Sequence, residues 1–112
     1  MIPWRVLEDV AEIETITKNS FDRPCLIFKH SRRCEISHLA KKRLEREWNF
    51  DKAAITPYFL DLIPNREISD EIARHFAIRH ESPQILLIAG GICTYTESHV
   101  GISFRELEKK LG

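Results

Sequence analysis

Apolar residues recur at intervals of three or four positions in four stretches of the chain, which predicts four amphipathic helices. In the first stretch Val10, Ile13 and Ile16 fall on one face, and Asp9 is a suitable N-cap. In the second stretch the apolar stripe consists of Ile36, Leu39, Ala40, Leu44 and Trp48. The four helices are predicted over residues 9–20, 34 or 35–48, 70–76 and 103–111.

Short continuous apolar runs lie between these helices and predict strands that are buried on both faces. The clearest run is residues 25–28, and the polar residues 29–33 after it predict a loop. Gly90 and Gly91 form a two-residue hairpin signal between the last two strands. Residues 4–7 fit an edge strand or a loop. The other strands are predicted over residues 54–62, 84–88 and 92–96.

The order of these elements predicts the fold class. Early alternation of strands and helices favours parallel pairing, and the glycine hairpin adds an antiparallel pair. We therefore expect an α/β fold, with a central mixed sheet of four to five strands and helices on both faces. The 112 residues suit one domain that buries its own core without metal or disulfide staples.

The charge and hydropathy of the chain exclude some function classes. Seventeen Lys and Arg residues balance seventeen Asp and Glu residues, which disfavours non-specific nucleic-acid binding. The longest apolar run, residues 85–89, is far short of the ~20 residues of a membrane span. The first five residues lack the apolar stretch of a signal peptide. We expect a cytoplasmic domain with no nucleic-acid or membrane partner.

The three cysteines lie far apart in the chain, and the five histidines do not sit at zinc-finger spacing from them. We therefore expect no metal, and no structural disulfide in a reducing cytoplasm. The strand from Cys25 to His30 spans roughly 15 Å, too far for a bond between Cys25 and Cys34. Cys25 is expected in the core, and Cys93 in the core or at an edge.

Cys34 lies at the predicted start of a helix. Free backbone N–H groups and the helix dipole favour an anion there, which lowers the pKa of a thiol. Arg32 and Arg33 add to this effect, whereas the carboxylate of Glu35 opposes it. The hydroxyl of Ser37 is placed to donate toward the sulfur. Acting alone, a Cys34 thiolate must exchange with a small thiol or with another protein.

Ser82 and Pro83 stand directly before the strand predicted over residues 84–88. A strand, a loop, C-x-x-S at a helix start and then a proline that opens the next-to-last strand resemble the thioredoxin-like layout. The chain resembles the YtxJ-type monothiol bacilliredoxins more specifically. The motifs that carry this likeness are F-K-H-S-R-R-C-E-I-S over 28–37, Y-F-L-D-L-I over 58–63, R-H-E-S-P-Q over 79–84 and S-H-V-G-I over 98–102.

The resemblance implies a thioredoxin-like fold and a role in bacillithiol-dependent thiol exchange. It makes Cys34 the attacking thiol and Pro83 a cis proline that faces it. The family often has proline directly after the cysteine, where this chain has Glu35. A carboxylate at that position disfavours the thiolate. The expected partners are S-thiolated client proteins and a low-molecular-weight thiol.

Bacillithiol carries a pair of carboxylates, so the resemblance also implies a cationic binding site. Backbone groups of Ser82, beside the proline, could pair with the ligand as an added strand does. His99 lies in the loop before the last helix and is a candidate contact. The candidate cations are Lys29, Arg32 and Arg33, with Arg79 and His80 from the loop before Pro83.

Two other functions remain open on the sequence. Some C-x-x-S relatives of the monothiol glutaredoxin type carry a [2Fe–2S] cluster between two subunits, although Glu35 here replaces the glycine of that class. The chain could also be a non-catalytic interaction module in which the thiol is incidental. Visible absorption distinguishes the first alternative, and a thiol titration distinguishes the second. The oligomeric state is not predicted.

Overall fold

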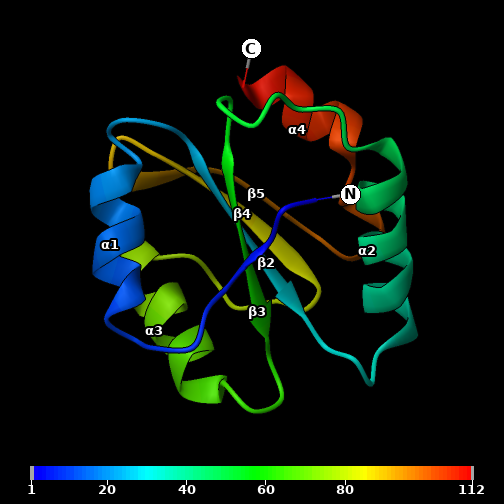
Figure 1. The fold of residues 1–112 in the computed structure, drawn as a ribbon. Helices are drawn as coiled ribbons and strands as arrows, with labels where there is room; N and C mark the ends of the chain where they lie inside the picture. The colour runs from blue at the N-terminus through cyan, green and yellow to red at the C-terminus, as the bar shows by residue number, and fades with distance from the viewer. Residues whose placement is uncertain (1, 112) are drawn as a thin grey trace.

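A computed structural model describes residues 2–111 and places a five-stranded mixed sheet at the centre of the molecule (Figure 1). The sheet order is β1-β3-β2-β4-β5. β3 pairs in parallel with β1 and β2, whereas β4 pairs antiparallel with β2 and β5. This confirms the predicted fold class. The strands are β1 (Arg5–Val6), β2 (Cys25–His30), β3 (Thr56–Asp61), β4 (Gln84–Ala89) and β5 (Ile92–Ser98).

Helices cover both faces of the sheet (Figure 1). Ile16 of α1 and Ile72 of α3 belong to the hydrophobic cluster on one face, together with Ile27 of β2. Leu44 of α2 and Leu107 of α4 belong to the cluster on the other face. The helices are α1 (Glu12–Asn19), α2 (Glu35–Glu47), α3 (Arg66–Phe76) and α4 (Phe104–Leu111), with a short 3₁₀ helix η1 (His99–Gly101) before α4.

The central strand β2 is longer than the sequence pattern predicted. Lys29 and His30 were expected in a polar loop, but both are buried in the strand. Lys29 pairs with Leu60 of β3 and with Gln84 of β4, and His30 pairs with Asp61. Because β3 and β4 flank β2 and helices cover both faces of the sheet, the side chains of Lys29 and His30 are buried. The residues that leave the sheet are thus residues 31–33.

Two helices begin at residues other than those predicted. Before α1 the carboxylate of Asp9 accepts the N–H of Ala11, and the carboxylate of Glu12 accepts the N–H of Asp9. These contacts form a capped turn, so the helix itself starts at Glu12. α3 starts at Arg66, ahead of the predicted residue 70, because Ile68 already belongs to its buried face.

The apolar stripe predicted for α2 is wrong for two of its members. Ile36 is 42% exposed and Leu39 is 63% exposed. The helix instead turns Ser37, Ala40 and Leu44 toward the sheet, and all three are buried. Two small side chains on this face let the helix lie close to the sheet. Two large apolar side chains consequently point away from the core.

The orientation of α2 predicts unequal effects of two leucine substitutions on stability. Leu44→Ala should lower the free energy of unfolding by about 2–5 kcal/mol, because it leaves a cavity in the core. Leu39→Ala should change it by no more than about 0.5 kcal/mol. Urea denaturation followed by circular dichroism measures both. Equal losses would mean that α2 buries the stripe that the sequence suggested.

Candidate functional site

Cys34 is the N-cap residue of α2. Its N–H donates to the carbonyl of Ser31 at 3.1 Å, and its own carbonyl accepts the N–H of His38 at 3.1 Å. Cys34 is neither fully buried nor fully exposed. The thiol therefore lies at the end of the helix where N–H groups have no carbonyl partners, as the sequence predicted.

Two arginines precede this cysteine in the turn between β2 and α2. Both Arg32 and Arg33 are exposed. The guanidinium of Arg32 lies 3.5 Å from the carboxylate of Asp61, and the carbonyl of Arg32 accepts a hydrogen bond from His38 at 2.7 Å. The turn thus brings two positive charges to the region around Cys34, on solvent-exposed side chains.

Ser37 is fully buried, and its hydroxyl has two partners. The hydroxyl oxygen accepts the N–H of Ser31 at 3.0 Å and lies 2.7 Å from Nδ1 of His30. The sulfur of Cys34 is not among its partners, contrary to the predicted donation. The reason is the orientation of α2, which turns Ser37 toward the sheet. Ser37 therefore fastens the first turn of α2 to the loop that carries the cysteine.

The buried ring of His30 lies behind the loop that carries Cys34, in contact with Ser37. It packs against the rings of Phe28, Phe59 and His38, with centroid distances of 5.8, 5.4 and 4.9 Å. Burial, followed by the proximity of His38 and Lys41, lowers the pKa of His30. Burial thus favours the neutral form of the ring that contacts Ser37.

The Ser82–Pro83 peptide bond is cis, the geometry that the family resemblance implied. Pro83 directly precedes Gln84, which pairs with Lys29 near the end of β2. Because β2 and β4 are antiparallel, the loop of Cys34 and the loop of Pro83 leave the sheet at the same end. The hydroxyl oxygen of Ser82 is buried and has no hydrogen-bond partner within residues 2–111.

A third segment, η1, joins this end of the sheet. The N–H of His99 donates to the carbonyl of Pro83 at 3.1 Å. The guanidinium of Arg43 on α2 donates to the carbonyls of Ile102 and Val100, at 2.7 and 3.3 Å. The structure thus brings Cys34, Pro83 and His99 to one region, and Arg43 fixes one side of it.

The comparison with protein families identifies this arrangement. Residues 5–107 match the family described as Monothiol bacilliredoxin BrxC. The chain belongs to this family. Membership supports a thiol-based redox function, and it agrees with a single cysteine placed at the start of α2.

Solved structures show the same fold. A provisionally assigned oxidoreductase with a thioredoxin fold has a TM-score of 0.78 and 24% identity, covering 96% of this chain and 92% of its own. Thioredoxin from Malassezia sympodialis has a TM-score of 0.73 and 14% identity over 99% and 90% of the two chains. Thioredoxin from Fasciola hepatica has a TM-score of 0.70 and 16% identity over 96% and 95%. The architecture of this bacilliredoxin family member is therefore that of thioredoxin.

The predicted role of Lys29 as a ligand-binding cation needs correction. Its side chain is fully buried, and Nζ donates to the carbonyl of Ser69 at 3.3 Å and to Nδ1 of His80 at 3.2 Å. Side chains alternate along β2, so Lys29 faces α3 while the Cys34 helix covers the opposite face. Burial lowers the pKa of Lys29 to about 8, against the opposing effect of Asp70.

The other two cysteines lie away from the candidate site. Cys25 is fully buried at the opposite end of β2 from the Cys34 loop, and burial raises its pKa to about 11. Cys93 on β5 is partly buried, with its sulfur 3.4 Å from the carbonyl of Tyr95, and burial raises its pKa too. The core position predicted for Cys25 is confirmed. Of the three cysteines, Cys34 is thus the one that lies at the candidate site.

Several residues of this region were missed at the level of sequence. The side chain of Gln84 holds the loop before the cis proline, since its amide donates to the carbonyl of Arg79 and its oxygen accepts the N–H of Glu81. The sequence pattern assigned no role to His30, and it placed Arg43 on a solvated helix face without a role, whereas His30 contacts Ser37 and Arg43 bonds to Ile102. All three act through contacts between distant parts of the chain, for which their spacing gives no signal.

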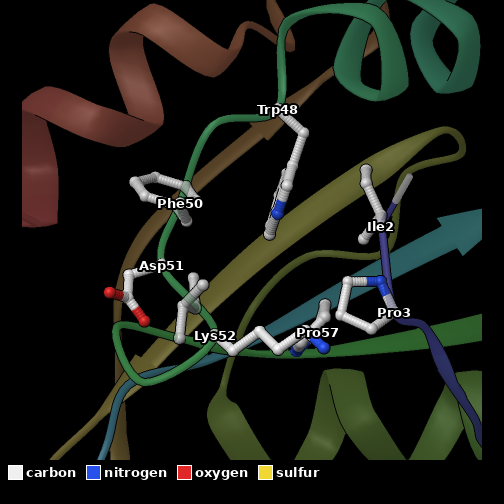
Figure 2. Close-up of a pocket in the computed structure, with 8 residues that line it drawn as sticks. Ile2, Pro3, Trp48, Phe50, Asp51, Lys52 and Pro57 are labelled. Carbon is white, nitrogen blue, oxygen red and sulfur yellow. The ribbon is translucent and has the colours of Figure 1, made fainter.

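A mostly apolar pocket of about 290 Å³ lies at the opposite end of the sheet, beside the start of β3. Figure 2 shows the ring of Trp48 with Ile2 and Pro3 along its wall, and Asp51 and Lys52 at its border. Cys34 lies beyond the other end of the parallel strand β2. This pocket is therefore separate from the candidate site.

Neither a metal site nor a membrane span emerges from the part of the chain that the structure describes. Within residues 2–111, His, Cys, Asp and Glu side chains do not gather in threes in a way that suits a metal ion. None of the helices formed by these residues is long and apolar enough to cross a bilayer.

The burial of Lys29 predicts a pH dependence of stability. Its pKa falls from 10.5 in the unfolded chain to about 8 in the folded one, so between these values the unfolded chain binds more protons. The contribution of Lys29 to the free energy of unfolding should therefore rise by about 1–2 kcal/mol between about pH 7.5 and pH 9.5. The contribution is measured as the difference in the free energy of unfolding between the wild type and Lys29→Met, obtained from urea denaturation at each pH. A difference that is independent of pH would contradict the buried position.

The contacts of Ser37 predict that its hydroxyl stabilises the attachment of the Cys34 loop to the first turn of α2. Ser37→Ala should lower the free energy of unfolding by about 1–3 kcal/mol, because the partly buried N–H of Ser31 loses its acceptor and His30 loses its partner. Denaturation measures the loss, and iodoacetamide alkylation across pH follows the Cys34 thiol. Unchanged stability with a shifted alkylation profile would show instead that the hydroxyl acts on the sulfur.

Proposed function

We propose that this chain exchanges thiols and disulfides through Cys34 and removes bacillithiol, or a similar low-molecular-weight thiol, from mixed disulfides on client proteins. The observation that carries the proposal is the placement of the three cysteines. Cys34 caps α2 at the end of the sheet that carries the cis Ser82–Pro83 bond, whereas Cys25 is fully buried and Cys93 lies beside the β4–β5 hairpin, at the opposite end of the sheet. One sulfur thus lies at the candidate site.

In the first step the Cys34 thiolate attacks the sulfur of the small thiol within the mixed disulfide. A new S–S bond forms between Cys34 and the small thiol, and the S–S bond to the client breaks. The electron pair of that bond leaves with the client sulfur, which departs as a thiolate and takes a proton from water. The client is reduced, and Cys34 is oxidised to a mixed disulfide.

In the second step another molecule of the low-molecular-weight thiol, as its thiolate, attacks the sulfur of the small thiol on Cys34. The bond to Cys34 breaks, a disulfide of two small thiols leaves, and the Cys34 thiolate returns. Ser37 occupies the place where a dithiol protein has its second cysteine, so the release depends on a thiol from solution. We place this reaction in a reducing cytoplasm, where such thiols are abundant.

The charges near Cys34 suit a small thiol that carries carboxylates. Arg32 and Arg33 are exposed at the turn, and Arg79 is exposed in the loop before Pro83. Guanidinium groups bind carboxylates with paired hydrogen bonds. Lys29 is excluded from this set because its amino group is buried against α3. Backbone groups of Ser82, beside the cis proline, offer further hydrogen bonds to the ligand, as an added strand does.

Intact-mass measurement after incubation with a bacillithiolated client protein tests the proposal. We expect an adduct of one bacillithiol on Cys34 and the release of a free client thiol, because Cys34 is the available nucleophile. Cys34→Ser should abolish the adduct, and the matched variants Cys25→Ser and Cys93→Ser should keep it.

Other results of the same preparation would favour the alternative functions. An adduct that persists in Cys34→Ser contradicts the assigned nucleophile. Visible absorption of the purified protein would indicate a [2Fe–2S] carrier. Alkylation of Cys34 no faster than that of a free cysteine, together with no adduct, would indicate a non-catalytic interaction module.

A further inference from the structure

Three large apolar side chains remain exposed around the candidate site. Ile36 is 42% exposed, Leu39 is 63% exposed and Val100 is 78% exposed. Scattered apolar side chains are ordinary on protein surfaces, but grouped ones mark places of interaction. We refer to Ile36, Leu39 and Val100 as the apolar rim.

The contacts of α2 and η1 show that the apolar rim is one group. Ile36 and Leu39 lie three residues apart and therefore share one side of α2. Arg43, one turn beyond Leu39, donates to the carbonyl of Val100 and so holds η1 against the same side of the helix. The rim thus spans two elements that a side chain fastens together.

The apolar rim lies beside the reactive sulfur. Ile36 is in the first turn of α2, which Cys34 caps. Val100 follows His99, whose N–H is bonded to the carbonyl of Pro83. The rim therefore extends from the start of α2, next to Cys34, to the segment that is bonded to Pro83.

The fold itself does not need these side chains. α2 attaches to the sheet through Ser37, Ala40 and Leu44. Full burial of the rim side chains would gain hydrophobic free energy, and in the isolated molecule Leu39 and Val100 remain mostly exposed. A partner that covers the rim would gain this free energy.

The charges next to the rim select among possible partners. Arg33 is exposed and has no ion pair within residues 2–111. Arg32 is 61% exposed and lies 3.5 Å from its one acidic partner, Asp61. Both precede Cys34 directly, and Glu35 is the one acidic residue in the first turn of α2. The charges thus complement an acidic segment.

We propose that the apolar rim docks the client protein, through a segment that carries a large apolar side chain and a carboxylate near its thiolated cysteine. This inference rests on the proposed function and adds to it the chemistry of the partner. A second copy of the chain on the rim would cover the sulfur that the exchange needs open. The occupant is therefore the client.

The test compares two substrates that share the same small thiol. One is a bacillithiolated peptide with leucine and glutamate next to its cysteine, and the other is the mixed disulfide of bacillithiol with free cysteine. Leu39→Ser and Val100→Ser should each lower the ratio of kcat/KM for the peptide to kcat/KM for the small disulfide by about fivefold or more. Exchanging the peptide glutamate for lysine should lower the same ratio in the wild type.

Ile92→Ser is the matched control. Ile92 is also 64% exposed, but it lies at the β4–β5 hairpin, at the opposite end of the sheet from Pro83. This variant should leave the ratio unchanged. Circular dichroism of all three variants should show the wild-type spectrum.

The outcomes distinguish this inference from the proposed function. If the wild type exchanges with both substrates and no rim variant changes the ratio, the docking surface is wrong and the exchange reaction stands. If the wild type exchanges with neither substrate, both are wrong. If the wild type forms a dimer that Leu39→Ser dissociates and Ile92→Ser does not, a second copy occupies the rim, and the inference is overturned.

Discussion

The antiparallel pairing of β2 with β4 is the constraint on which the site depends. It places the end of β2 opposite the start of β4, so the loop with Cys34 and the loop with Pro83 emerge together. The parallel pairing of β2 with β3 brings Asp61 to the same end, where it reaches Arg32. A shift of one residue in either register would exchange the two faces of β2 and separate these groups.

The alternation of side chains along β2 gives the site support on both faces of the sheet. Lys29 faces α3 and contacts His80, in the loop that leads to the cis proline. The next residue, His30, faces α2 and contacts Ser37, behind the loop of the cysteine. Two consecutive buried polar residues therefore hold the two loops, one on each side. Neither residue needs to touch a substrate for this role.

Local pattern was enough to predict the helices, four of the five strands and the place of Cys34, because strand burial and helix capping are local properties; it left β1 open between a strand and a loop. It was not enough for Lys29, whose polar neighbours resemble a solvated loop until β3 and β4 flank it.

Local pattern also failed to predict which side of α2 faces the sheet. A stripe through Ile36 and Leu39 and one through Ser37 and Ala40 have the same period, and only packing against the sheet decides between them. Arg43 bonds to the carbonyls of Val100 and Ile102, which follow it in the chain by 57 and 59 positions. A search for local patterns cannot detect contacts over such separations.

The placement of Cys25 and Cys93 at the end of the sheet opposite Cys34 has a kinetic consequence for the proposed reaction. A protein with a second reachable sulfur can expel its bound adduct by an internal attack, at a rate that does not depend on the surroundings. Neither Cys25 nor Cys93 lies where it can attack an adduct on Cys34, so the recovery rate of the protein follows the concentration of free small thiol. When that pool runs low, the protein would accumulate in its capped form, with the reactive sulfur shielded from further oxidation.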